Sequence, residues 1–248
     1  MSSPPLPART AFTDEQFAQP YPDGAQHQYW YAARNRIIAR RLGALMRRGQ
    51  DVVLEIGCGR GIVVEHLRKL GWNALGCDPG RPRPISPEVA PHLNVGTDAF
   101  ELPVRLREAV KCVLMLDVLE HLAEPGAFLR GCREKFPSCE VVFATLPARM
   151  ELWSNYDEYY GHFRRYSIKS ARALFAEQAF QIVDCGYFFH LLYVPALLLR
   201  CMRLKRSLVI KAPRRRGLHA ALGAWFDAEE RLLPSFVPGT SLYLAARG

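Results

Sequence analysis

The 248-residue sequence predicts an α/β fold built on a mostly parallel sheet. Short apolar runs alternate with segments of helical periodicity, which is the pattern of strands joined by crossover helices. Most of the first five runs are apolar throughout, as expected of strands that helices cover on both faces. The first run, at 51–57, leads into the glycine-rich string LEIGCGRG. Together these observations predict a Rossmann-like sheet with helices on both faces.

Seven strands and five helices are predicted in order along the chain. A first helix over 25–48 is indicated by Tyr31, Ile38 and Leu42, which share one helical face. The strands are short apolar runs bounded by glycine, proline or polar residues, at 51–57, 73–78, 92–96, 111–119, 140–147, 180–188 and 241–247. The other helices are expected at 60–70, 127–135, 167–178 and 218–233. A proline-rich stretch, 78–91, replaces the helix that usually follows a second strand.

The domain organisation is simple. Residues 1–24 are rich in proline and polar residues and are expected to form a flexible arm. Residues 25–248 are expected to form one domain, within which 190–235 interrupts the strand–helix alternation as a helical, basic and apolar insertion before the last strand.

The positive charge is concentrated in one place. The chain carries a formal net charge of +9, and the segment 200–216 holds eight Lys and Arg residues and no Asp or Glu. The rest of the chain is nearly neutral, which excludes a uniformly basic, histone-like protein. A local anionic partner is indicated instead.

Cysteine usage and the N-terminal sequence indicate a cytoplasmic protein. The seven cysteines form no C-x-x-C pair and show no zinc-finger spacing with histidine, and no apolar signal segment opens the chain. The longest apolar stretch, 186–199, is shorter than the roughly 20 residues of a transmembrane helix and contains His190 and Pro195. We therefore expect no membrane span, although an interfacial helix remains compatible with this stretch.

The glycine turn predicts a ligand at the N-terminus of a helix. Gly57, Gly59 and Gly61 follow the first strand directly, where glycine permits a sharp turn and close approach to main-chain amides. Glu55, still on the strand, can orient the turn or accept a hydrogen bond from a ligand ammonium. A bound pyrophosphate would not favour a carboxylate there.

Two further carboxylates follow the next strands. Asp78 ends the second strand, where a carboxylate can accept both hydroxyls of a ribose. Asp98 follows the third strand, where it can accept from an adenine amino group while the amide of Ala99 donates to the ring. An NAD-binding Rossmann domain is the competing interpretation, but the G-x-G-x-G spacing and Glu55 fit it poorly.

These residues resemble the class I S-adenosylmethionine-dependent methyltransferases, close to the bacterial type 11/12-like small-molecule and lipid enzymes. The matching strings are VLEIGCGRG, ALGCDP, VGTDAFELP, LMLDVLEHL and VVFATLP. The resemblance implies a seven-stranded sheet whose last, antiparallel strand lies between the fifth and sixth. It also implies S-adenosylmethionine as cofactor. Its methionine part would contact Gly57, Gly59 and Gly61, its ribose Asp78, its adenine Asp98 and Ala99, and the region near its sulfonium Asp117 and Val118. The other residues expected to bind the cofactor are Glu55, Cys58 and Pro79.

The string DVLEHL offers one candidate base. A hydroxyl acceptor benefits from a base, and His121 lies just after Asp117 and Glu120. The alternative is that His121 only packs or caps the next segment. No second histidine neighbours this pair in sequence, so we expect no metal site.

A second cluster, SNYDEYYGHFRRYS at 154–167, resembles a loop of bacterial methyltransferases acting on small molecules, lipids or sugar-linked carriers. His162 can take a proton, Arg164 can hold a phosphate or carboxylate, and Tyr160 can contact the acceptor. The alternative is a rigid loop in which Asp157 pairs with an arginine. Arg165 is the better candidate for that structural role.

Trp30 lies in an aromatic-rich helix, QHQYWYAARNR, before the first strand. It can form a lid over the cofactor pocket or pack against the sheet edge. The sequence has no Asn/Asp-Pro-Pro-Tyr/Phe string after the fourth strand, no Pro-Cys nucleophile and no recognisable nucleic-acid module, so no nucleic-acid partner is expected.

The insertion suggests contact with lipid. Residues 187–216 combine aromatic and leucine-rich sequence with the basic cluster, which suits an anionic membrane surface. An oligomer interface and a solvated arginine-rich loop are the alternatives. We therefore expect a methyltransferase that acts on a hydroxyl of a small-molecule or lipid-like acceptor, in the cytoplasm or peripherally at the membrane. A protein or nucleic-acid methyltransferase and a non-catalytic cofactor-binding subunit are the alternative functions.

Overall fold

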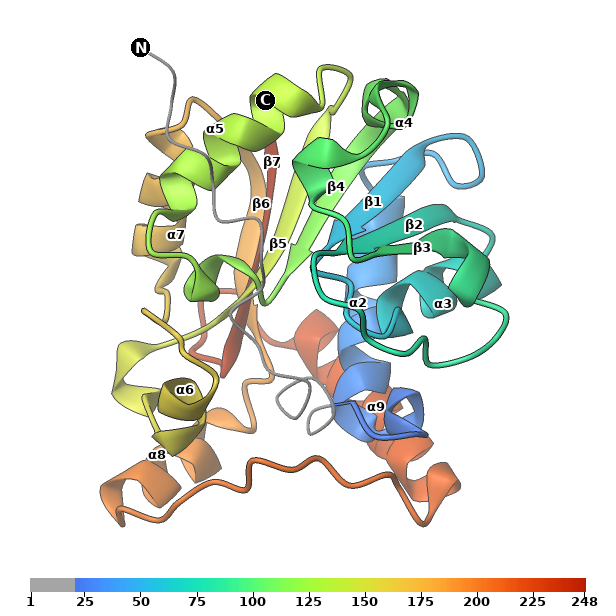
Figure 1. The fold of residues 1–248 in the computed structure, drawn as a ribbon. Helices are drawn as coiled ribbons and strands as arrows, with labels where there is room; N and C mark the ends of the chain where they lie inside the picture. Colours follow the sequence, from blue (N-terminus) through green and yellow to red (C-terminus); the bar gives the residue numbers. More distant parts are fainter. Residues whose placement is uncertain (1–20) are drawn as a thin grey trace.

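The computed structural model describes residues 21–248, and Figure 1 shows one central sheet between helices. Its strand order is β3-β2-β1-β4-β5-β7-β6. The strands are β1 (Val52–Ile56), β2 (Asn73–Asp78), β3 (Leu93–Val95), β4 (Val110–Leu116), β5 (Val141–Pro147), β6 (Gln181–Phe188) and β7 (Ser241–Arg247). Strand β7 runs antiparallel between β5 and β6, and the first five strands pair in parallel. The predicted seven-stranded sheet with an inserted antiparallel last strand is thus confirmed.

Helices cover both faces of the sheet. One face carries α2 (Tyr29–Gly43), α3 (Ile62–Lys69) and α9 (Arg216–Leu232). The other face carries α4 (Val104–Ala109), α5 (Pro125–Lys135) and α7 (Ile168–Ala176). Two further helices, α6 (Asn155–Tyr159) and α8 (Tyr193–Cys201), lie at the end of the sheet to which β4 and β5 point (Figure 1). Single 3₁₀ turns are η1 (Ala25–His27), η2 (Ala90–His92), η3 (Ala99–Glu101), η4 (Leu119–His121) and η5 (Met150–Leu152).

The two apolar layers explain the continuous apolar strands. Val53 packs into the layer under α2 and α3, whereas its neighbour Leu54 packs into the layer under α5. Leu42 and Phe136 are fully enclosed in these two layers. Burying an aliphatic or aromatic side chain of this size contributes about 1.5–3 kcal/mol, so each layer favours the sheet strongly.

The N-terminal helix differs from the expected 25–48. A 3₁₀ turn comes first, and the Gln28 side chain then caps α2 by accepting from the amide of Trp30 at 2.6 Å. Of the expected flexible arm, residues 1–20 lie outside the described residues. Its last residues are held in place, because the Arg60 guanidinium donates to the Tyr21 carbonyl and to Asp23.

The insertion contains α8, α9 and an extended link between them. We call residues 202–215 the connecting segment; it runs from α8 to α9 along the lower side of the molecule in Figure 1. Helix α9 packs on α2, where Arg40 and Arg41 both pair with the buried Glu230. Its Phe226 is buried against the sheet layer, so α9 belongs to the core rather than to a free amphipathic surface. Among the described helices, none is long and apolar enough to cross a membrane.

Candidate functional site

The turn after β1 is shaped by glycines that no other residue could replace without strain. Gly57, Gly59 and Gly61 have φ values of 72°, 51° and 81°. A Cβ atom on Gly57 would lie 2.9 Å from the side chain of Val118, and one on Gly61 would lie 2.7 Å from that of Leu93. The turn therefore needs glycine for its conformation and for space. It places main-chain amides at the N-terminus of α3, where an anionic or polar ligand group is favoured.

Asp78 braces this turn from the end of β2. Its two carboxylate oxygens accept from the amides of Gly59 at 2.9 Å and Gly80 at 2.8 Å. Burial raises the pKa of Asp78, while these two amide hydrogen bonds act in the opposite direction. Asp98 follows β3 and caps η3 by accepting from the Phe100 amide at 2.8 Å, next to the buried Ala99. Asp78 and Asp98 thus lie at or just after the ends of two neighbouring strands, at the same edge of the sheet.

A buried charge cluster lies beside the turn. Glu55 is only 4% exposed, and its Oε2 has no hydrogen-bond partner among the described residues. Burial raises the pKa of Glu55 to about 8. Asp117, with φ 57°, forms an ion pair with Arg34 of α2, whose guanidinium lies 4.8 Å from the ring centroid of Trp30. An orphaned carboxylate oxygen in such a place suits a cationic ligand group, such as an ammonium.

Arg34 is a site residue that sequence reasoning missed. It is 5% exposed and reaches across to Asp117, which lies 83 residues further along the chain. The only local signal is its place four residues after Trp30, on the same face of the helix. Trp30 itself stacks on Phe189 at 5.7 Å and also lines the cavity described next, while its role as a lid over the cofactor stays a prediction.

A cavity of about 440 Å³ opens beside Asp117. Its volume lies in the range of small-molecule sites. The walls come from α2, the turn after β4, α6 with the loop that follows it, α8 and the connecting segment. The predicted residues that line it are Trp30, Asp117, His121, Tyr160 and His162.

Arg164, expected to hold the acceptor, is not among the residues that line the cavity. Its guanidinium donates to the carbonyl oxygens of Leu122 at 3.2 Å and Ala123 at 2.7 Å. These bonds tie the loop after α6 to the loop after β4. The contact of Arg164 with the acceptor stays a prediction, and the bonds that its Nη2 makes to main-chain carbonyls do not place it at this cavity.

Asp157 organises the loop that carries His162. It forms the capping box of α6 with Ser154, whose amide donates to Oδ2 at 2.9 Å. Arg165 grips both oxygens of the same carboxylate, at 2.7 and 3.1 Å. Burial alone would raise the pKa of Asp157, but the hydrogen bonds from His162 and Arg165 hold it well below its usual range. The expected structural pair of Asp157 with an arginine is thus present, and the arginine is Arg165.

His162 completes a carboxylate–histidine pair. Its Nδ1 lies 2.9 Å from Oδ1 of Asp157, a partner that can only accept, so Nδ1 carries the proton. Nε2 is then left with its lone pair available to accept. The main-chain amide of Phe163 donates to the carbonyl of Glu120 at 2.8 Å and so draws this loop toward η4.

The same main-chain bond brings a second histidine near His121, which the sequence did not predict. The rings of His121 and His162 lie edge to face with centroids 4.6 Å apart. Ligand atoms of Glu120, His121 and His162 all lie within 4.8 Å of one another, a set that a divalent cation could use. The argument that no second histidine neighbours Glu120 and His121 is therefore wrong.

Burial favours the uncharged forms of both Glu120 and His121. Burial, and then the charge of His162, lower the pKa of His121 to about 3. Burial, and then the charge of Asp117, raise the pKa of Glu120 well above its usual value. His121 is consequently neutral at working pH.

Comparisons with known proteins identify the family of the chain. A family model described as a methyltransferase domain matches residues 26–184, more than half of the chain. Two curated relatives are ubiquinone biosynthesis O-methyltransferases. That of Bradyrhizobium diazoefficiens is 31% identical over 99 residues, covering 38% of this chain and 39% of the relative. That of Citrobacter koseri is 28% identical over 130 residues, covering 48% and 54%. The chain thus matches about half or less of the length of these relatives.

Solved structures share the fold at low identity. The 1,6-didemethyltoxoflavin-N1-methyltransferase of Burkholderia thailandensis, with bound S-adenosylhomocysteine, gives a TM-score of 0.55 at 16% identity, covering 94% of this chain and 86% of that one. The phosphoethanolamine N-methyltransferase 2 of Haemonchus contortus, in complex with S-adenosyl-L-methionine, gives 0.55 at 13% identity, covering 96% and 60%. With the strand order, the glycine turn and the family match, these likenesses lead to one assignment: the chain belongs to the methyltransferase-domain family, as a class I S-adenosylmethionine-dependent methyltransferase.

Proposed function

We propose that the protein transfers the methyl group of S-adenosylmethionine to a hydroxyl of a small-molecule or lipid-linked acceptor. The observation that carries this proposal is the Asp157–His162 pair, because its His162 lines a cavity that Asp117 also lines. The names of the ubiquinone biosynthesis O-methyltransferase relatives support oxygen as the methylated atom.

The cofactor is expected to lie across the carboxyl ends of β1, β2, β3 and β4. The glycine turn can receive the methionine part and Glu55 its ammonium. Asp78 is suited to the ribose hydroxyls, because each of its oxygens has a second lone pair beyond the amide bond it already accepts. The remaining contacts proposed are Cys58, Pro79, Asp98, Ala99, Asp117 and Val118.

Methyl transfer is an in-line displacement in which the enzyme mainly aligns the two reactants. A bond forms from the acceptor oxygen to the methyl carbon as the carbon–sulfur bond breaks, and the sulfonium becomes a neutral thioether. The hydroxyl proton passes to Nε2 of His162, and the Asp157 carboxylate stabilises the imidazolium that results. Neutral His121 adds no charge that would oppose this proton transfer.

The cavity wall supports an acceptor with an apolar part. Helix α8, its N-cap residue and the connecting segment contribute Leu192, Pro195, Ala196, Leu199, Leu204 and Ile210. Because polar side chains such as Asp117 and His162 line the same cavity, an acceptor with both a polar and an apolar part fits best.

Two measurements test this function. Calorimetry with S-adenosylhomocysteine should show binding that Asp78→Ala weakens strongly, because that change removes the brace of the turn. Labelled S-adenosylmethionine incubated with membrane and soluble cell fractions should transfer label to an extractable small or lipid-linked product. Label recovered only in protein or nucleic acid would favour the alternative methyltransferase classes. Cofactor binding without any transfer would favour a non-catalytic subunit.

Membrane contact is a second, separable part of the proposal. Apolar side chains that are at least half exposed lie within or shortly before the basic segment 200–216. They are Val194, Leu198, Met202 and Leu204. A basic residue near an anionic bilayer contributes about 1 kcal/mol, so eight can sustain peripheral binding. Flotation with phosphatidylglycerol vesicles at low salt tests it. If the intact protein stays at the bottom of the gradient, the membrane contact is excluded.

A further inference from the structure

Four arginines line the cavity, and they fall into two pairs. Arg34 and Arg165 are buried, and each is neutralised by a carboxylate, Asp117 and Asp157 respectively. Arg200 of α8 and Arg206 of the connecting segment form no ion pair with any described residue. The second pair is therefore available to an anionic ligand.

Arg206 is held in place more firmly than an arginine in an extended surface segment usually is. The Asn155 side chain accepts from the Arg206 amide at 2.9 Å and donates to the Arg206 carbonyl at 3.0 Å. The Tyr160 hydroxyl donates to the carbonyl of Leu208 at 3.1 Å. These three bonds fix the main chain of the connecting segment on both sides of the arginine side chain.

The Arg206 guanidinium turns toward the cavity. It lies 4.9 Å from the ring centroid of Tyr156, which also lines the cavity. Desolvation, and then the charge of Arg165, lower the pKa of Arg206, although the residue is exposed at the cavity mouth. A fixed, partly desolvated cation without a counter-charge is the arrangement that recognises phosphate or carboxylate.

We propose that Arg206, assisted by Arg200, binds an anionic group of the methyl acceptor, a phosphate or a carboxylate. This proposal rests on the proposed function and specifies its substrate class. The anionic group lies at the basic mouth of the cavity, whereas the hydroxyl that is methylated lies at His162. The apolar Leu199 and Leu204, which belong to the same two elements, contact the part of the acceptor that joins the two groups.

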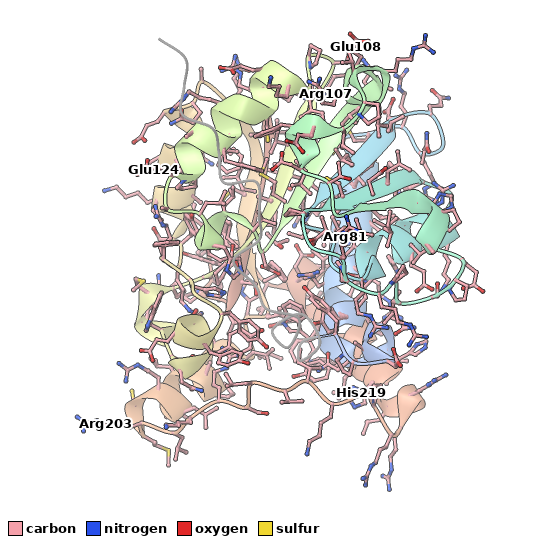
Figure 2. The ribbon with its side chains drawn as sticks, in the orientation of Figure 1. Arg81, Arg107, Glu108, Glu124, Arg203 and His219 are labelled. Carbon is pink, nitrogen blue, oxygen red and sulfur yellow. The ribbon has the colours of Figure 1, made fainter. Side chains whose placement is uncertain are left out.

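The experiment compares ligands that differ only in the anion. Farnesyl phosphate, farnesol and inorganic phosphate are titrated by calorimetry into protein saturated with S-adenosylhomocysteine. The variants are Arg206→Gln, Arg206→Lys and Arg200→Gln. The matched control is Arg203→Gln, since Arg203 is in the same segment but does not line the cavity, and it projects outward from the end of α8 (Figure 2).

We expect wild-type protein to bind farnesyl phosphate at least about tenfold more tightly than farnesol. Arg206→Gln should abolish that difference, Arg200→Gln should reduce it and Arg206→Lys should retain part of it. Arg203→Gln should leave it unchanged. Equal affinities for the two ligands in the wild type, or equal effects of Arg206→Gln and Arg203→Gln, would overturn the proposal.

Two further binding measurements distinguish an anionic group on the acceptor from free phosphate and from a lipid headgroup. Inorganic phosphate should compete with farnesyl phosphate only weakly, because it lacks the apolar contacts. Binding to phosphatidylglycerol vesicles should fall equally in Arg206→Gln and Arg203→Gln. A loss specific to Arg206→Gln on vesicles, with unchanged binding of farnesyl phosphate, would assign Arg206 to a membrane surface and reject the subsite. Failure of the proposed function would appear differently, as absence of methyl transfer with these binding differences intact.

Discussion

His162 and Asp157 are joined by a 2.9 Å contact between Nδ1 and Oδ1, although each belongs to a different local structure. Asp157 is fixed first, by the capping box of α6 and by Arg165. His162 comes three residues after the end of α6, and its own amide donates to the Asp157 carbonyl at 2.9 Å. The carboxylate therefore sets the tautomer of the imidazole, and this relation makes His162 the stronger candidate base.

The first prediction concerns proton transfer. His162→Gln should lower kcat by about 100- to 10,000-fold, because it removes a group that can accept the hydroxyl proton. The affinity for S-adenosylhomocysteine should not change. Methyl-label transfer measures the first effect, and calorimetry with S-adenosylhomocysteine measures the second.

His27→Gln is the matched control, since His27 is exposed and lies outside the cavity. Chelation with EDTA distinguishes a His162 that acts as a base from a His162 that binds a metal, because proton transfer to the imidazole does not need a metal. Loss of activity on chelation, with recovery on adding Mg²⁺ or Zn²⁺, would assign Glu120, His121 and His162 to metal binding and contradict the role of His162 as a base.

The sheet and the cofactor turn could be predicted because their signals are local. Continuous apolar runs indicate strands covered on both faces, and the three glycines lie within five residues of one another. The ends of parallel strands meet at one edge, so Asp78 and Asp98 could be placed beside the turn before any coordinates. All of this depends on periodicity and strand order alone.

The acceptor side could be predicted only in part, because its contacts join distant segments. Arg34 reaches Asp117 only through the packing of α2 on the sheet, and His121 meets His162 only through the bond from Phe163 to Glu120. Arg164 and Arg165 are identical in type and adjacent in sequence, yet they point to different partners. The sequence favours Arg165 as the partner of Asp157, but the contacts of Arg164 with two carbonyls of a distant loop depend on tertiary packing.

The second prediction concerns acid stability. The pKa of Asp157 is lowered in the folded state, so the stabilisation is present above the unfolded pKa, near 4, and is lost as pH falls through the lower folded value. Asp157→Asn should reduce the free energy of unfolding at pH 7 by about 3–5 kcal/mol, because it leaves Arg165 buried without its counter-charge. Urea unfolding should show the gap between wild type and variant narrowing below pH 4. A gap independent of pH would contradict the ionic origin of this stabilisation.

The third prediction concerns Glu55 and cofactor binding. Its pKa of about 8 keeps the carboxyl protonated in the free protein at pH 7. A cofactor ammonium beside it would lower that pKa, so S-adenosylhomocysteine binding should release up to about one proton per site. Calorimetry at pH 7 in buffers of different ionisation enthalpy measures this release.

Glu55→Gln should remove that proton release while leaving the fold intact, because the amide is close in shape to the neutral carboxyl. The raised folded pKa also means that Glu55 costs stability as pH rises from about 4.5 to about 8. The variant should therefore gain stability relative to wild type across that interval. Unchanged proton release in Glu55→Gln would place its source elsewhere.

The fourth prediction concerns the turn itself. Gly57→Ala places a Cβ atom 2.9 Å from Val118 in a residue with φ 72°, so both the backbone and the neighbouring side chain oppose it. We expect a loss of about 1 kcal/mol or more in the free energy of unfolding and at least about tenfold weaker binding of S-adenosylhomocysteine. Gly217→Ala is the control, because nothing lies within 4 Å of the added atom and the position is in helix α9. That variant should be neutral or slightly more stable, since alanine favours helix over glycine. If the two substitutions weakened cofactor binding equally, the glycine turn would not be the cofactor site.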